Sequence, residues 1–225
     1  MIHVLAEGYD LDAPWLADEL KGILRPGSRV TIVALSFRDA QVKSAQDWEA
    51  LYGREGGRYT GALVDPLAAY GIGADRVAFI NCFADSKEAA LAKIRRADVL
   101  YFPGGVPDRM MQRIEALGLA DAMRAFEGVV LGYSAGAMIQ LAEYHVSPDD
   151  DYPRFAYYGG LGRLSGFYYE PHYGDWQTQR EAISRVLAER HAPVYATREG
   201  KGALIIEDGR IKTVGEVEVF RPREA

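Results

Sequence analysis

The sequence of 225 residues has a single cysteine, Cys82. A single cysteine cannot form a disulfide within the chain or supply a cysteine-rich zinc site, which favours a reducing compartment. No stretch approaches the roughly 18 consecutive apolar residues of a membrane-spanning helix. The first residues also lack the basic start and long apolar run of a secretory signal peptide. These absences together predict a cytoplasmic protein with no membrane partner.

Positive charge is also scarce. Lys and Arg total 26 against 32 Asp and Glu, which gives a formal net charge of −6. Nucleic-acid phosphates favour basic surfaces, so no nucleic-acid partner is expected. Histidine is rare as well, with four in the chain. The choice of a catalytic base is therefore narrow.

Short apolar runs rich in Val, Ile, Leu and aromatic residues alternate with segments of helical spacing over residues 1–145. Several runs are apolar at consecutive positions, as in parallel strands buried on both faces. The expected strands span residues 2–6, 29–35, 76–80, 98–102 and 128–132. The expected helices span residues 14–24, 42–52, 64–70, 86–96 and 108–126. This alternation predicts an α/β fold, a three-layer α/β/α sandwich around a mostly parallel, doubly wound sheet.

The C-terminal third has a different pattern. Residues 147–163 are rich in turn-forming, acidic and aromatic residues and predict a long loop, and residues 176–190 predict a helix. Short strands are expected near 193–197, 203–206, 210–213 and 216–220, with Asp208-Gly209 as a hairpin turn. These strands predict a small antiparallel extension of the sheet. We expect one domain over residues 1–225.

The motif Gly132-Tyr133-Ser134-Ala135-Gly136 follows the apolar run VVL and precedes AMIQLAEY. Small residues around a serine between a strand and a helix are typical of a nucleophile elbow, which lifts the hydroxyl clear of the sheet. The amide of Ala135 would then face a developing oxyanion. A glycine-flanked turn with a capping serine is the simpler alternative. The strand before the motif and the helix after it favour Ser134 as a nucleophile.

A serine nucleophile needs a histidine base and a carboxylate that orients it. His172 lies in FYYEPHYGDW, after a strand-like aromatic run and before a helix. Sheet-based enzymes present catalytic side chains at such positions. His3, His145 and His191 are more simply structural. The alternative for His172 is a loop histidine packed among aromatic residues.

Among the carboxylates that follow His172 in the chain, six are candidates for this acid: Asp175, Glu181, Glu189, Glu199, Glu207 and Asp208. Glu199 stands at the end of the strand-like run APVYAT, before Gly200. This position favours it as the orienting acid, because strand ends meet at one edge of a sheet. A turn carboxylate paired with Arg198 or Lys201 is equally consistent with the sequence.

A glycine pair, Gly104-Gly105, ends the fourth predicted strand in YFPGG. A backbone without side chains can approach a reacting carbonyl and donate an amide to the oxyanion together with Ala135. A plain tight turn is the alternative.

These motifs resemble the peptidase E family, which includes aspartyl dipeptidases and cyanophycinases and shares a flavodoxin-like fold with class I glutamine amidotransferases. The resemblance runs from the first strand to about residue 206. It is carried by YFPGG at 101–105, LGYSAGAM at 131–138, EPHY at 170–173 and TREGKGALI at 197–205. It implies a serine peptidase acting on short peptides, without a cofactor or metal.

The family order of serine, histidine and acid implies Ser134, His172 and Glu199 as the triad. The resemblance likewise implies that His172 accepts the proton of Ser134 and passes it to the leaving amine. It also implies that the amides of Gly105 and Ala135 hold the oxyanion.

The chain departs from the family in one motif. Aspartyl dipeptidases usually have Gly-Gly-Asn-Thr or a similar run after the strand at 98–102, whereas this chain has Gly-Gly-Val-Pro-Asp at 104–108. The end-specificity is therefore open between an aspartyl dipeptidase and a carboxypeptidase-like enzyme. Either would need a basic residue for a substrate carboxylate. Four arginines near the motifs in sequence are candidates: Arg109, Arg154, Arg163 and Arg180.

Two other functions remain open. A serine esterase of the α/β-hydrolase type shares the elbow motif and would use Asp175 as acid and His191 as base. A non-catalytic binding protein is possible on the same fold, because fold does not fix function. The 147–163 segment would suit a specificity lid or a plain surface loop. A homo-oligomer is a further expectation, since four tyrosines are predicted at the surface: Tyr157, Tyr158, Tyr168 and Tyr169.

Overall fold

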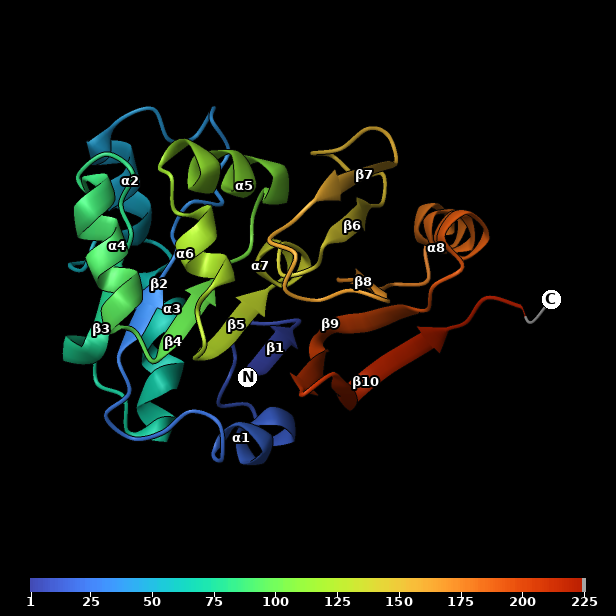
Figure 1. Ribbon diagram of the computed structural model, residues 1–225, viewed down its shortest axis with the longest axis horizontal. Helices are drawn as coiled ribbons and strands as arrows, with labels where there is room; N and C mark the ends of the chain where they lie inside the picture. Colours follow the sequence, from blue (N-terminus) through green and yellow to red (C-terminus); the bar gives the residue numbers. More distant parts are fainter. Residues whose placement is uncertain (224–225) are drawn as a thin grey trace.

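The computed structural model describes residues 1–223 as a layered α/β protein (Figure 1). Its strands are β1 (Ile2–Ala6), β2 (Val30–Ile32), β3 (Val77–Phe79), β4 (Val99–Phe102), β5 (Val129–Tyr133), β6 (Glu143–Val146), β7 (Ala156–Gly159), β8 (Tyr168–Glu170), β9 (Val194–Glu207) and β10 (Arg210–Phe220). The α-helices are α1 (Pro14–Leu20), α2 (Ala45–Tyr52), α3 (Thr60–Val64), α4 (Lys87–Arg96), α5 (Pro107–Ala116), α6 (Ala120–Arg124), α7 (Ala135–Met138) and α8 (Gln177–Arg190). Two 3₁₀ helices, η1 (Asp65–Tyr70) and η2 (Ala74–Arg76), precede β3.

The main sheet has the strand order β10-β9-β1-β5-β4-β2-β3, and β8 pairs with β9 beside this path. The five strands from β1 to β3 in that order are parallel to one another. All five were predicted from consecutive apolar residues, and the observed strands start and end within a few residues of the predicted ranges. The predicted parallel α/β sheet is confirmed.

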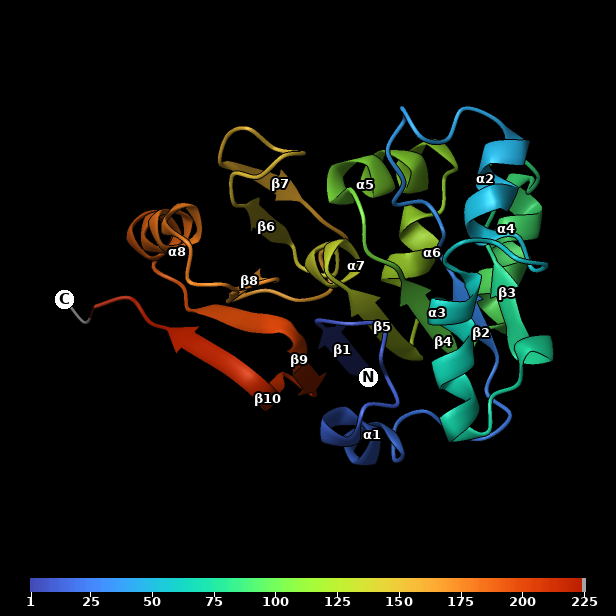
Figure 2. The ribbon, with the colours of Figure 1, turned by 180° about the vertical axis from the view of Figure 1, so that it is seen from behind.

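Alternate residues of each strand enter two separate cores. Leu5 and Leu100 pack on the face covered by α4, α5, α6 and α7, whereas Val4 and Val99 pack on the face covered by α1, α2, α3 and η1. Figure 1 shows the first face and Figure 2 the second. The period of two along a strand thus sends apolar side chains to both helical layers, as a doubly wound sheet requires.

The C-terminal strands extend the sheet beyond the parallel strands. β9 is antiparallel to β1, with Ile2 opposite Glu207 and Ala6 opposite Ala203, so residues 194–202 of β9 run past the carboxyl end of β1. β8 lies parallel to this overhanging half of β9, with Glu170 opposite Ala196. The carboxyl end of β8 therefore points back toward the carboxyl ends of β1 and β5. The antiparallel extension predicted from sequence is confirmed. It consists of two long strands, β9 and β10, where four short strands were predicted.

The 147–163 segment, which was expected to be a long loop, contains β7. This strand pairs antiparallel with β6 and forms a separate two-stranded sheet. The helix after the elbow has only four residues, because the chain turns at Leu141 into β6, and His145 lies on that strand. Leu141, Tyr144 and Val146 are buried against the core, and this tertiary packing ends the helix.

The tyrosines predicted at the surface are mostly covered. Tyr169 is fully buried in the core and Tyr168 is 7% exposed, while Tyr157 and Tyr158 are half-buried. They therefore do not form the exposed aromatic patch expected for self-association. Among residues 1–223, no helix is both long enough and apolar enough to cross a bilayer.

Candidate active site

Ser134 lies at a sharp turn between β5 and α7. Its backbone has φ 48° and ψ −112°, and the four-residue helix begins at the next residue. A positive φ is strained for a residue with a side chain, and such strain is typical of a nucleophile elbow. The amide of Ser134 donates to the carbonyl of Ala6 at 3.3 Å, which ties the turn to the end of β1.

The two outer glycines of the motif are required by close backbone contacts. A Cβ on Gly132 would lie 2.2 Å from the carbonyl oxygen of Gly136, and a Cβ on Gly136 would lie 1.9 Å from that of Phe102. Both distances are well below van der Waals contact. The elbow therefore packs too tightly against itself and β4 for any side chain at either position.

His172 lies two residues after the end of β8, also with a positive φ of 54°. Its Nε2 is 2.8 Å from Oγ of Ser134. The side-chain amide of Gln179 donates to the His172 carbonyl, and the amide of Tyr173 donates to the carbonyl of Thr197. These bonds to α8 and β9 fix the loop, so that the imidazole meets the serine at hydrogen-bond distance.

Glu7 occupies the other side of the imidazole. It follows β1 directly and is 1% exposed, and its Oε1 lies 2.5 Å from Nδ1 of His172. Its Oε2 is 2.9 Å from Oγ1 of Thr197, which in turn lies 2.8 Å from the hydroxyl oxygen of the buried Tyr169. Ser134, His172 and Glu7 thus form a continuous line of polar contacts, the arrangement in which a serine hydroxyl can be deprotonated.

The surroundings of His172 act on its pKa in opposite directions. Burial alone would lower the pKa, but the contact with Glu7 and its negative charge outweigh burial and raise the pKa above the ordinary value of 6.5. The charges of Glu199 and Glu170 add to this effect. A raised pKa makes the imidazole a stronger base toward the serine proton.

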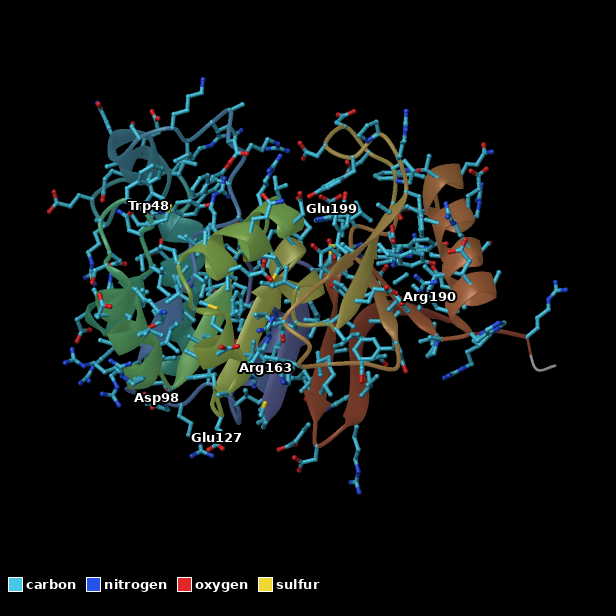
Figure 3. All side chains as sticks on the ribbon, turned by 45° about the horizontal axis from the view of Figure 1, so that its top comes forward. Trp48, Asp98, Glu127, Arg163, Arg190 and Glu199 are labelled. Carbon is cyan, nitrogen blue, oxygen red and sulfur yellow. The ribbon has the colours of Figure 1, made fainter. Side chains whose placement is uncertain are left out.

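Glu199 was the acid predicted from sequence, and it is not the carboxylate that contacts His172. The ladder between β9 and β10 passes from Thr197–Val217 to Gly202–Gly215, so residues 198–201 bulge out of the sheet. Glu199 is exposed on this bulge and, within residues 1–223, has neither a hydrogen bond nor an ion pair to His172. Figure 3 labels it among the loops at one end of the sheet. Its influence on His172 is that of a nearby charge.

Gly104 and Gly105 lie between β4 and α5, beside the elbow. A Cβ on Gly105 would lie 2.1 Å from the carbonyl oxygen of Ser36, and its φ is +137°, so only glycine fits. Ser36 Oγ also donates to the carbonyl of Gly104 at 2.6 Å. Within residues 1–223, the amides of Gly105 and Ala135 donate to no protein group. They are therefore available to an oxyanion at Ser134.

Two cavities meet at Ser134 and His172. The one we call the acidic cavity has a volume of about 130 Å³, and its polar lining includes His145, Ser147 and Glu170. The one we call the tyrosine cavity lies toward β2 and has a volume of about 350 Å³. Its lining includes Tyr9, Arg38, Tyr52, Tyr59 and Tyr133. If a peptide bond lay at Ser134, the residue before the bond and the residue after it would therefore lie in different cavities.

The four candidate arginines line neither cavity. Arg163 donates to carbonyls of Met123, Arg124 and Phe126, which come just before β5, whereas Ser134 follows the other end of that strand. Two of the other candidates form ion pairs with carboxylates: Arg109 with Asp39, and Arg180 with Asp175. Of the cavity-lining residues, only Arg38 has a guanidinium, and Asp151 binds it.

Sequence reasoning missed Glu7 because it considered only carboxylates after His172. A usable signal was present in MIHVLAEG, where a glutamate directly follows a buried strand. The carboxyl ends of β1, β4 and β5 meet at one edge, which also carries Ser134 and Gly105. Glu170 and Ser147, which line the acidic cavity, were missed as well.

Comparison with known proteins identifies the family of this chain. The model of peptidase family S51 matches residues 55–214, which is more than half of the chain. The search of curated proteins found no match to this chain. Two crystal structures have the same fold: one described under the name peptidase E from Listeria monocytogenes EGD-e, and one of a peptidase from an acI-B1 Actinobacterium.

The Listeria structure has a TM-score of 0.66 and 19% identity, with 96% of this chain and 98% of that chain covered. The actinobacterial structure has a TM-score of 0.63 and 18% identity, with 99% and 90% covered. At such identities the likeness concerns the fold. The residues matched by the family model include Ser134 and His172 but not Glu7. The chain belongs to peptidase family S51, the peptidase E family, and is a serine-type peptidase.

Proposed function

We propose that this chain is an exopeptidase that hydrolyses short peptides through a triad of Ser134, His172 and Glu7. The observation that carries the proposal is the position of His172, with Nε2 at 2.8 Å from the serine oxygen and Nδ1 at 2.5 Å from the glutamate oxygen. This is the geometry of a serine nucleophile, its base and the acid that orients the base.

In the proposed reaction, Ser134 Oγ attacks the peptide carbonyl while its proton passes to His172 Nε2. Glu7 stabilises the resulting imidazolium, and the amides of Gly105 and Ala135 hold the oxyanion. Collapse of the tetrahedral intermediate breaks the C–N bond, and His172 gives its proton to the leaving amine. Water then hydrolyses the acyl-enzyme by the same route in reverse, which releases the acid product.

A preference for short peptides is supported by how the 147–163 segment is held across the site. Asp151 binds Arg38 of the loop after β2, and the hydroxyl of Tyr152 donates to Asp108 of α5 at 2.5 Å. Asp149 of the same segment lines both cavities. The acidic cavity is small beside the roughly 300–1,000 Å³ of pockets for drug-sized ligands. A long peptide would have to displace these contacts.

The end-specificity is proposed to be neither aspartyl nor carboxypeptidase-like. Each would need a guanidinium or ammonium for a substrate carboxylate, and Arg38, which alone among the lining residues has such a group, is bound to Asp151. The proposed partner is a short peptide. A cytoplasmic location and self-association stay proposals; the first is favoured by the single free Cys82.

A fluorophosphonate probe together with a dipeptide and tripeptide library tests the proposal. His172→Asn and His191→Asn form a matched pair, since both histidines have a positive φ that asparagine tolerates. We expect that His172→Asn and Ser134→Ala abolish both labelling and turnover, whereas His191→Asn keeps both. Full activity of His172→Asn would favour the esterase alternative, in which His191 is the base. A folded wild-type protein with neither labelling nor turnover would favour the non-catalytic alternative.

A further inference from the structure

A second polar cluster lies beside the proposed triad and, within residues 1–223, makes no hydrogen bond to it. Glu170 is the last residue of β8 and is 3% exposed. Its Oε2 is 2.7 Å from Nε2 of His145, and Ser147 Oγ lies 2.8 Å from both carboxylate oxygens. A buried carboxylate with these contacts is held in one orientation, since β8 fixes its backbone and β6 brings the histidine.

His145 adds an unsatisfied polar atom to the cluster. The residue is fully buried, and its Nδ1 has no hydrogen-bond partner within residues 1–223. A neutral imidazole that donates from Nε2 to Glu170 has a lone pair on Nδ1. A buried acceptor without a donor is costly and uncommon in a folded protein. His145 also lines the acidic cavity, so this unsatisfied side chain is part of the cavity wall.

The charges around the acidic cavity have one sign. Glu170 and Asp149 are its carboxylates, and no lysine or arginine is among its lining residues. Met138 and Val146 supply an apolar wall, and the side chain of Trp176 stands at its rim with 61% exposed. A substrate carboxylate would be repelled here, whereas an ammonium or guanidinium would meet a fixed negative charge with little competing water.

We propose that Glu170, together with Ser147 and His145, binds a cationic nitrogen of the substrate next to the scissile bond. The inference rests on the proposed peptidase function, because Ser134 and His172 line the same cavity. Glu170 is joined to His172 through Pro171 alone, so a cation bound by the carboxylate lies in the same cavity as the serine hydroxyl. This chain would then prefer a positive group where an aspartyl dipeptidase prefers a negative one.

Two parts of a peptide could supply the nitrogen: the free α-amino group or the side chain of lysine or arginine. Four dipeptide substrates with the same leaving group separate them: Lys-Xaa and Leu-Xaa, each free and N-acetylated. If the α-amino group is bound, acetylation abolishes cleavage of both and the side chain matters little. If the side chain is bound, N-acetyl-Lys-Xaa is cleaved well and both leucine substrates poorly. Equal rates on all four would overturn the inference.

The variant Glu170→Gln removes the negative charge and keeps the side-chain shape, and Glu189→Gln is a matched control on the exposed face of α8. We expect Glu170→Gln to lower kcat/KM for the cationic substrates by about 10- to 100-fold, mainly through KM, because a charged hydrogen bond is lost. Cleavage of a substrate without a cation should fall by a much smaller factor, about threefold or less, because Glu170 acts on His172 only as a nearby charge. The control should match the wild type on every substrate.

Binding to Ser134→Ala protein gives a readout that does not depend on turnover. Titration calorimetry should show that the double variant Ser134→Ala/Glu170→Gln binds the preferred cationic peptide more weakly than Ser134→Ala does. The two proteins should bind the neutral peptide equally well. An equal loss for cationic and neutral peptides would reveal a structural role and overturn the inference. If the wild type cleaves peptides but shows no cation preference, the inference fails while the peptidase function stands. If fluorophosphonate labelling of Ser134 also fails, the proposed function fails with it.

Discussion

Glu7 and His172 are far apart in the sequence and meet at 2.5 Å, between Oε1 of the glutamate and Nδ1 of the histidine. The contact depends on the overhang of β9, because β8 follows that overhang and returns His172 to the edge of the parallel strands. The orientation of the base thus depends jointly on the first strand and on the C-terminal extension.

Replacing Glu7 should impair catalysis far more than replacing Glu199. We expect Glu7→Gln to lower kcat by about 10³- to 10⁴-fold, as loss of the acid does in serine peptidases generally, because the imidazole loses its fixed tautomer and charge partner. Glu199→Gln should change kcat by less than about fivefold, since an exposed carboxylate acts only through solvent. Steady-state kinetics of the two variants on one peptide compares their kcat values. A larger loss in Glu199→Gln than in Glu7→Gln would indicate that Glu199 is the acid.

The pH profile should report the same contact. A general base works when neutral, so activity falls as pH drops through the pKa of His172. Because Glu7 raises that pKa above 6.5, the acidic limb of kcat/KM should lie above pH 6.5 in the wild type. In Glu7→Gln, burial dominates and the limb should move to lower pH. An unmoved limb in this variant would mean that Glu7 does not set the pKa.

The elbow should not tolerate a methyl group at Gly136. Because that Cβ would lie 1.9 Å from the Phe102 carbonyl oxygen, Gly136→Ala should lower the free energy of unfolding by about 3 kcal/mol or more. Gly22→Ala is the control, since a Cβ there meets nothing within 4 Å and the change should stay within about 0.5 kcal/mol. Urea unfolding of both variants checks this. Equal stabilities would show that the backbone at the elbow can relax.

His3 should make the protein less stable in acid. Burial lowers its pKa to about 4, and the charges of Arg163 and the N-terminus act in the same direction, against the hydrogen bond that Nδ1 of His3 donates to Oε1 of Gln140. The unfolded chain therefore binds a proton near pH 6.5 that the folded protein accepts only near pH 4. Between these values the free energy of unfolding falls as pH falls, by on the order of 2–3 kcal/mol for this residue.

The variant His3→Gln removes this titration. Its free energy of unfolding should fall less than that of the wild type between pH 7.5 and 4.5, measured with urea. The exposed His191 gives the control, because His191→Asn should follow the wild-type curve. Parallel curves for His3→Gln and the wild type would contradict the prediction.

Freeing Arg38 should change substrate preference. Asp151 now binds this guanidinium, which lines the tyrosine cavity. We expect Asp151→Asn to raise kcat/KM for acidic peptides by about three- to tenfold, since an unpaired guanidinium can bind a carboxylate. Cleavage of a neutral peptide serves as the internal control. A uniform change on acidic and neutral peptides would point to disturbance of the 147–163 segment instead.

Much of this fold could be predicted from the sequence because its parallel strands are continuous apolar runs, as in VLYF of β4. Ser134 was also predictable, since an elbow is built from residues adjacent in the chain. The proposed acid, Glu7, was not, because its contact with the loop after β8 depends on strand order and on the bulge in β9. The length of α7 also depends on tertiary packing, because burial of Leu141 and Tyr144 ends the helix after four residues.

The bulge at residues 198–201 has a consequence for the charge around His172. It leaves Glu199 in solvent yet close enough for its charge to act on the imidazole, while Glu7 makes the contact. Two carboxylates thus act on one imidazole in different ways: the buried one holds it by contact, and the exposed one adds only negative charge.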